Sequence, residues 1–175
     1  MKKLELIVNP IAGLGGSVGL KGSDGTDVVR EATEMGAVPN APRRAIEALE
    51  EVVRDLSVKV FTYPDSMGAD EARAVGVTPE VVGSQLDRDT SAEDTRRAAT
   101  EMLKHNVDLL LFAGGDGTAR DIYEAVGERV TTLGIPAGVK MHSGVYATTP
   151  RTAGLAAASF LAGESPDTKL AEVMD

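Results

Sequence analysis

A turn of almost bare main chain, with one carboxylate at its centre, follows the most apolar run of the sequence. Residues 107–113 read Val-Asp-Leu-Leu-Leu-Phe-Ala and lead directly into a Gly-Gly-Asp-Gly-Thr turn. Ligands of open α/β sheets collect at the carboxyl ends of strands. Glycines there let backbone N–H groups approach a phosphate, and the next helix adds its positive end. We therefore expect phosphate contacts from Gly114, Gly115 and Gly117.

Asp116 carries the only charged side chain of this turn. Two roles are open for it: orienting an attacking hydroxyl, or holding Mg²⁺ directly or through water. Phosphoryl transfer has a loose transition state, so positioning and charge neutralisation matter more than a strong base. A turn Asp that bonds its own backbone is the structural alternative. We assign Asp116 as the catalytic residue.

The residues after Asp116 are expected to open a helix over 119–126. Thr118 fits the N-cap of that helix, and its hydroxyl could instead donate to a phosphate oxygen. Arg120 would then neutralise transferred charge or remain solvated. Asp121 is explained by the preference for acids at a helix start.

An Asn-Pro step ends the first predicted strand, at Asn9 and Pro10. Such a step forms turns, and the Asn amide offers a nucleotide both a donor and an acceptor. Backbone access to a phosphate chain is expected from the glycines of the next loop, Gly13, Gly15 and Gly16. The loop is not a dinucleotide fingerprint, because Val18 stands where its last glycine should fall, and the chain has no Walker Gly-Lys-Ser/Thr.

A third candidate segment, residues 134–143, reads Gly-Ile-Pro-Ala-Gly-Val-Lys-Met-His-Ser. Lys140 and His142 follow a predicted strand and could bring positive charge to anionic phosphates, and Ser143 adds a hydroxyl. With two His and no Cys in the chain, a zinc site is excluded.

The Gly-Gly-Asp-Gly-Thr turn resembles the signature of the NAD kinases and their relatives, the diacylglycerol and sphingosine kinases and, more distantly, the phosphofructokinases. Residues 8–16 resemble the Asn-Pro turn and glycine loop of that superfamily. Residues 134–143 resemble the third segment of the archaeal and polyphosphate-type ATP-NAD kinases. The resemblance covers nearly the whole chain, but only the amino-terminal half of a family member.

The resemblance implies a three-layer α/β fold and transfer of a phosphoryl group from ATP or polyphosphate, with Mg²⁺, to the 2′-hydroxyl of NAD. Asp116 would contact that ribose hydroxyl. Family members continue into a β-rich domain with an Asn-Glu pair that contacts NAD, and this sequence has no Asn-Glu pair. We expect a nucleotide-binding domain over 1–163 and the start of a connection to that further domain over 164–175.

Two alternatives stay open at this point. The acceptor could be a lipid, a sphingoid base or another small alcohol. The chain could also be a nucleotide-binding module or fragment without catalysis.

Composition excludes other classes of function. The net charge is −9 and aromatic residues make up 3% of 175 residues, which argues against nucleic acid. A small anion can still bind through local donors, because charge is screened over about 8–10 Å. The apolar stretch near the start is too short for a signal peptide or a membrane span. We expect a cytoplasmic protein, and a homo-oligomer, since half an active site would expose apolar surface.

Alternating elements predict a largely parallel sheet covered by helices on both faces. Strands are expected near 4–8, 58–63, 77–83 (broken by Pro79), 107–113 and 131–135, and helices near 28–34, 40–56, 69–75, 91–105, 119–126 and 150–161. In the long early loop, Lys21, Asp24 and Asp27 are expected to be solvated charges, with gating of the site as the alternative.

Overall fold

The computed structural model describes residues 1–20, 26–86, 89–138, 140–165 and 167–174. Its sheet has five parallel strands in the order β3-β2-β1-β4-β5. The strands are β1 (Lys2–Val8), β2 (Val58–Thr62), β3 (Glu80–Val81), β4 (Leu109–Gly114) and β5 (Thr132–Pro136). The α-helices are α1 (Leu14–Ser17), α2 (Thr26–Glu34), α3 (Ala41–Val53), α4 (Ala69–Ala74), α5 (Ala92–Met102), α6 (Asp116–Val126) and α7 (Pro150–Ala162), and the 3₁₀ turns are η1 (Asp65–Met67) and η2 (Leu103–His105).

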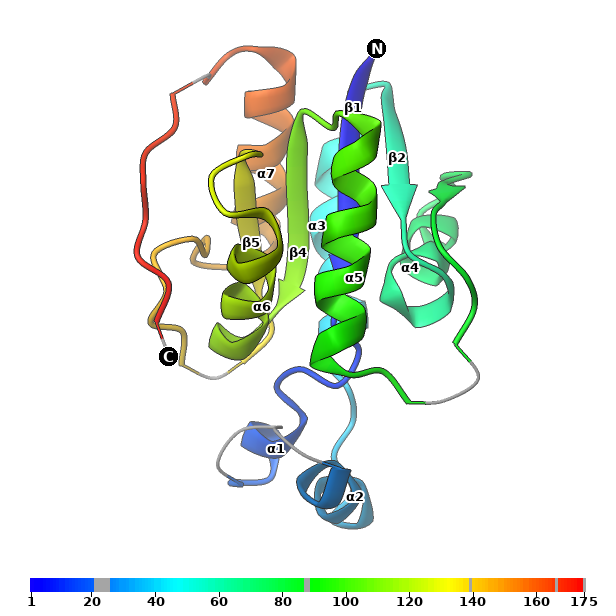
Figure 1. Ribbon diagram of the computed structural model, residues 1–175, viewed down its shortest axis with the longest axis vertical. Helices are drawn as coiled ribbons and strands as arrows, with labels where there is room; N and C mark the ends of the chain where they lie inside the picture. Colours follow the sequence, from blue (N-terminus) through cyan, green and yellow to red (C-terminus); the bar gives the residue numbers. More distant parts are fainter. Residues whose placement is uncertain (21–25, 87–88, 139, 166, 175) are drawn as a thin grey trace.

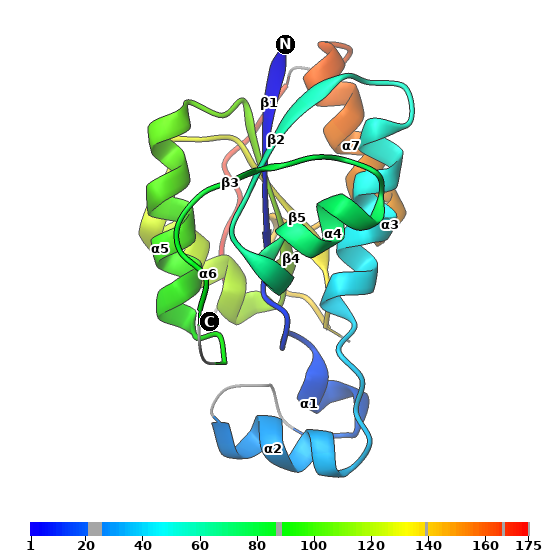
Figure 2. The ribbon, with the colours of Figure 1, turned by 90° about the vertical axis from the view of Figure 1, so that its right-hand side faces the viewer.

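Helices cover both faces of the sheet, which confirms the predicted three-layer α/β fold. Helices α5 and α6 lie on one face, and α3 and α7 lie on the other (Figures 1 and 2). The strands run downward in Figure 1, so their carboxyl ends meet at the lower edge, where α1 and α2 project from the body. Lys21 and Asp24 lie outside the described residues, so the expectation for them is not tested.

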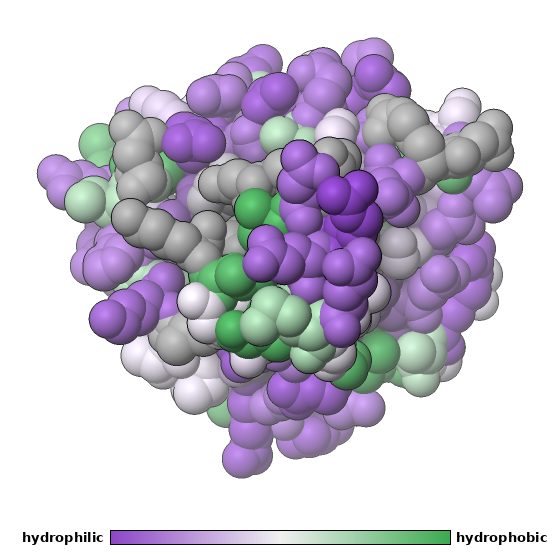
Figure 3. Space-filling view, turned by 90° about the horizontal axis from the view of Figure 1, so that it is seen from below, coloured by the Kyte–Doolittle hydropathy of each residue, from purple (hydrophilic) through white to green (hydrophobic). Residues whose placement is uncertain are grey.

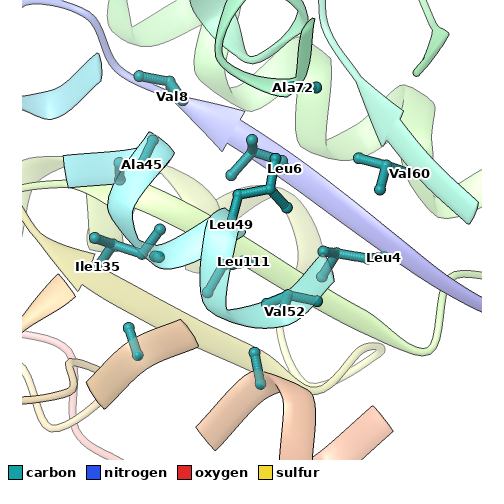
Figure 4. Close-up of a cluster of buried hydrophobic side chains, with 14 of the residues drawn as sticks. Leu4, Leu6, Val8, Ala45, Leu49, Val52, Val60, Ala72, Leu111 and Ile135 are labelled. Carbon is teal, nitrogen blue, oxygen red and sulfur yellow. The ribbon is translucent and has the colours of Figure 1, made fainter. Parts of the chain in front are cut away.

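Strict alternation along β1 divides the core into two clusters. Leu4, Leu6 and Val8 face α3 and α7, together with Leu111 of β4 (Figure 4). Ile7 points to the other face, where it joins a second cluster under α5 and α6. On the first face Gly154 of α7 lies so close to α3 that an added Cβ would stand 2.2 Å from the Ala48 carbonyl oxygen. A side chain there would push the two helices apart.

Local signals fix several helix ends. The Ser91 backbone N–H donates to the Asp94 carboxylate over 2.8 Å, as expected for a capping box at the start of α5. Gly163 ends α7 with φ of 79°, a left-handed conformation in which glycine carries little steric cost.

Three expected elements have different bounds in the structure. The strand predicted over 77–83 is only Glu80–Val81, since Pro79 has no N–H to donate to a ladder. The helix predicted from 119 begins at Asp116. The short helix α1 occupies part of the predicted early loop.

Each edge of the sheet exposes only a short row of backbone N–H and C=O groups. Strand β3, at one edge, has two residues. Along the other edge, the Gly134 N–H donates to Val145 O, and the Ala147 N–H donates to Gly134 O. After α7 the chain returns along the β5 side of the molecule (Figure 1). Within the described residues, no helix is long and apolar enough to cross a membrane.

Candidate active site

The three sequence motifs, numbered in chain order, are the Asn-Pro turn with its glycine loop (residues 8–16), the Gly-Gly-Asp-Gly-Thr turn (residues 114–118) and residues 134–143. They meet at the carboxyl ends of three adjacent strands, β1, β4 and β5. Strand β2 follows β1 on one side, and β4 lies on the other, so the strand order reverses between β1 and β4. Such a switch point leaves a crevice outside the strand ends, where open α/β sheets bind their ligands. Figure 3 looks onto this end and shows a hydrophobic patch near the centre of a largely hydrophilic surface.

Asn9 joins the first motif to the second. Its Nδ2 donates to the Thr118 hydroxyl over 3.0 Å, and its Oδ1 accepts the Ile11 N–H over 3.3 Å. The second bond is the Asx-type turn expected of an Asn-Pro step. The side-chain amide therefore holds the turn and the next helix together.

Gly13 joins the first motif to the third. Its φ is 76°, and an added Cβ would stand 2.2 Å from the Ala137 carbonyl oxygen. Both observations require glycine here. Gly15 and Gly16 lie in α1, where Gly15 is buried, so the loop is more compact than the open phosphate cradle that the sequence suggests.

Asp116 joins the second motif to the third. Its carboxylate accepts the His142 N–H at 3.0 Å and the Ser143 N–H at 2.9 Å. Burial alone would raise the pKa of the Asp116 carboxyl, but the hydrogen bonds from Ser143 and His142 outweigh burial and hold that pKa below its ordinary value. The group is a carboxylate at neutral pH, and it faces a loop of its own chain.

The first turn of α6 starts at Asp116, with Gly115 as the N-cap. The expectation that Thr118 is the N-cap is therefore wrong: it is the third helical residue, and its buried hydroxyl accepts from Asn9. The backbone N–H groups of a first turn have no acceptor within their own helix. With the helix dipole, they make this turn attractive to an anion.

The glycines of the turn have different surroundings. A Cβ on Gly114 would stand 2.4 Å from the Thr118 side chain, so close packing requires this glycine. A Cβ on Gly115 would meet nothing within 4 Å. Gly115 is therefore the position where the main chain is open to a ligand, and neither residue has a positive φ.

The candidate cations are all exposed. Lys140 and His142 lie on the loop that holds Asp116, and the His142 backbone rather than its ring makes the recorded contact. Arg120 of α6 lines a cavity beside β5. Ser143 is buried, with 5% of its surface exposed.

The sequence analysis missed two residues at this edge. Arg44 of α3 donates from Nη1 to the Pro136 carbonyl over 2.7 Å and so fixes the end of β5. The Tyr146 hydroxyl donates to the Gly115 carbonyl, and its ring lies against Phe112. The position of Arg44 at this edge could have been predicted from the topology. In a parallel sheet, the helix that follows β1 begins at the carboxyl edge and runs back along one face of the sheet.

Asp121 is not a helix-start acid, because α6 begins five residues earlier. It is buried and accepts from Arg96 of α5 over 2.6 Å, so it fastens two helices together. This correction follows directly from the earlier start of α6.

The structure has a large cavity elsewhere. About 1010 Å³ lie between α6, β5, α7 and residues 167–174, lined mainly by apolar side chains. Within the described residues, no three His, Cys, Asp or Glu side chains gather closely enough to hold a metal ion.

Comparison with known proteins agrees with this arrangement. A search of curated proteins finds no match. The family model described as the ATP-NAD kinase N-terminal domain matches residues 4–165, which include all three motifs and all of the sheet except the first two residues of β1. The chain therefore belongs to the ATP-NAD kinase family, as a kinase-type phosphotransferase domain.

Proposed function

We propose that this chain is the nucleotide-binding part of an enzyme that transfers a phosphoryl group from ATP or polyphosphate to the 2′-hydroxyl of NAD, giving NADP. One observation carries the proposal. The carboxylate of Asp116 is held ionised at the start of α6, where the three motifs meet. Family membership supports the kinase class of the reaction.

The carboxylate retains acceptor capacity for a substrate hydroxyl. Two carboxylate oxygens offer about four acceptor sites, and within the described residues two backbone N–H groups donate to them. A carboxylate with a lowered pKa is a weak base, yet it can orient a hydroxyl for in-line attack. The phosphate chain would lie against the first turn of α6 and the open Gly115.

The same geometry limits how Mg²⁺ could be held. Both oxygens of Asp116 already accept N–H groups, so direct coordination would displace them. Mg²⁺ usually keeps several waters and uses few protein ligands alongside substrate phosphates. The residues fit an ion held by the phosphate oxygens of the donor and by water. When bound, the ion would neutralise charge on the transferred group.

The third motif supports the archaeal and polyphosphate-type branch. Lys140 and His142 are exposed on the loop beside Asp116, where either could meet a long anionic donor. Polyphosphate offers only repeated phosphates, so its binding would depend on such cations and on backbone N–H groups. We propose the cytoplasm as the place of this reaction.

The direct test incubates the chain with NAD, Mg²⁺ and either ATP or polyphosphate, and measures NADP. A parallel reaction replaces NAD with a lipid or a sphingoid base. NADP formed by the wild type and not by Asp116→Asn supports the proposal. Phosphorylation of the lipid alone overturns the assigned acceptor. Nucleotide binding seen by calorimetry with no product from any acceptor indicates a module without catalysis.

We also propose that copies of this chain associate through apolar surface. The cavity beside β5 has a mainly apolar lining, and Leu170 and Leu155 are exposed, at 79% and 46%. Sedimentation velocity across a hundredfold range of concentration measures the association. A monodisperse monomer throughout contradicts it.

A further inference from the structure

Ser143 lies between the candidate catalytic carboxylate and the last described residues of the chain. Its backbone N–H donates to Asp116 over 2.9 Å, and its side chain helps to lower the pKa of that carboxyl. From the other side, the Met174 N–H donates to the same hydroxyl over 3.0 Å. One buried side chain thus connects residue 174 to Asp116.

A second bond fastens the same two segments. The Gly144 N–H donates to the Glu172 carbonyl over 2.8 Å. A Cβ on Gly144 would stand 3.3 Å from the Ala171 Cβ, so residue 144 and the segment are in close contact. Residues 171–174 therefore dock along the loop that carries His142 and Ser143.

The rest of this segment is lightly held. Residues 167–172 are exposed, and they border the cavity of about 1010 Å³ beside β5. Val173 is partly buried against the cluster under α5 and α6. A segment with few buried contacts can separate from the body at a small cost in free energy. Its attachment depends on a few contacts near its end.

The chemistry of a hydroxyl makes this attachment matter for Asp116. A Ser hydroxyl has one proton and two acceptor lone pairs, and it rotates to suit its neighbours. When a lone pair accepts the Met174 N–H, the proton is free to point toward Asp116. Hydrogen bonds in such a chain strengthen one another.

We propose that Ser143 is a positioning residue, through which docking of residues 171–174 sets the arrangement of the Asp116 carboxylate. The site is complete when the segment is docked, and the loop over Asp116 loosens when it detaches. The proposal rests on the proposed function only for the role of Asp116 as the reacting carboxylate. The physical coupling between the segment and the loop stands apart from catalysis.

The first experiment measures amide hydrogen exchange at His142 and Ser143 in the whole chain. Met174→Pro removes the N–H that Ser143 accepts, and Met174→Ala keeps it. We expect exchange in the proline variant to be about tenfold faster than in the alanine variant, the effect of losing about 1.4 kcal/mol of hydrogen bonding. Equal exchange in the two variants overturns the coupling.

A double-mutant cycle separates this coupling from local strain caused by proline. Ser143→Ala removes the acceptor without changing the segment. If the hydroxyl is the connection, Met174→Pro has little further effect on exchange in the Ser143→Ala background. Fully additive effects overturn the role of the hydroxyl, even where each single variant loosens the loop.

A separate experiment measures the effect of Ser143 on the rate of NADP formation. Ser143→Ala should lower kcat for NADP formation about tenfold with little change in the KM of the donor, and Ser143→Thr should restore most of it. A loss confined to KM contradicts a positioning role. If the wild type forms no NADP, the proposed function fails, and the exchange results still decide the coupling.

Discussion

Two carboxylates of this domain, one on a strand and one just beyond the end of the neighbouring strand, have opposite surroundings. Glu5 lies in the middle of β1, paired in register with Leu110 of β4, and is fully buried with no hydrogen-bond partner for either oxygen among the described residues. Asp116 lies just beyond the end of β4, partly exposed, and accepts two backbone N–H groups. Burial raises the pKa of the Glu5 carboxyl well above its usual range, while hydrogen bonds from Ser143 and His142 outweigh burial and lower the pKa of Asp116.

The difference follows from where main-chain donors are free. In the middle of a parallel sheet the ladder uses the backbone N–H groups, so a side chain there finds few donors. Where strands end, loops and the first turn of a helix present N–H groups that the ladder does not use. A charged catalytic group can therefore be held at the carboxyl edge, and an acid in the middle of the sheet stays protonated.

The largest expected effect is on kcat, which should respond very differently to substitution of Asp116 and of Glu5. Asp116→Asn should lower kcat for NADP formation by at least about a hundredfold, the usual worth of a positioned base. Glu5→Gln, which stays neutral and nearly isosteric, should leave kcat within about twofold. Steady-state rates of both purified variants, with circular dichroism to verify folding, check this. Equal losses in both variants would contradict the contrast.

A second prediction concerns pH and the stability of the fold. Because the folded state holds the proton of Glu5 more tightly than the unfolded state does, stability falls as pH rises above the unfolded pKa, by up to about 1.4 kcal/mol per unit for one group. The stability gain of Glu5→Gln over the wild type should therefore grow as pH rises above about pH 5, for as long as the folded wild type keeps the proton on Glu5. Urea unfolding at each pH measures this gain.

Glu71 of α4 provides the matched control. Burial raises the pKa of its carboxyl to about 7. The gain from Glu71→Gln should also grow with pH, but it should level off near pH 7, where the folded state loses the proton too. A gain that is constant with pH in both variants would contradict the environments assigned to them.

A third prediction compares two neighbouring glycines of the candidate site. Gly114→Ala places a Cβ against Thr118 and should cost about 1–3 kcal/mol of stability. Gly115→Ala meets open space, so it should change stability by less than about 0.5 kcal/mol while weakening nucleotide binding. Thermal unfolding and calorimetric titration with ATP measure the two effects. Unchanged ATP affinity in Gly115→Ala would contradict ligand approach at this position.

The smallest expected effect tests the link between the first two motifs. Asn9→Ala and Thr118→Val each remove one partner of the 3.0 Å hydrogen bond. A double-mutant cycle by urea unfolding should show a coupling of about 0.5–1.5 kcal/mol. A coupling near zero would mean that the two motifs are held together by other contacts, such as that between Gly13 and Ala137.

The fold was predictable because its signals are local and repeated. Alternating apolar strands and helix-period segments predicted five strands and helices on both faces. The site was predictable only as three separate motifs. That Asp116 accepts from His142 and Ser143 depends on how two loops fold over the sheet, and no spacing in the sequence records such a contact.

The errors have the same origin. Thr118 has the residue type of an N-cap, but α6 starts at Asp116, and the Thr118 side chain instead lies close to Gly114 inside the first turn. Asp121 has the charge of a helix-start acid, and only the meeting of α5 and α6 shows its ion pair with Arg96. The preference of a residue type for a helix position shows which positions that residue can occupy. Contacts between elements decide which of these positions it takes in the fold.

The two edges of the sheet affect how this protein can associate with other chains. One edge ends in a strand of two residues, where Lys59 and Glu80 form an ion pair over 2.6 Å. The other is bonded to the chain's own residues 145 and 147. Few unpaired backbone groups therefore remain at either edge to pair with a strand of another chain, which is the usual route from a β-protein to fibrils. Association of this protein should therefore be reversible and governed by side-chain chemistry.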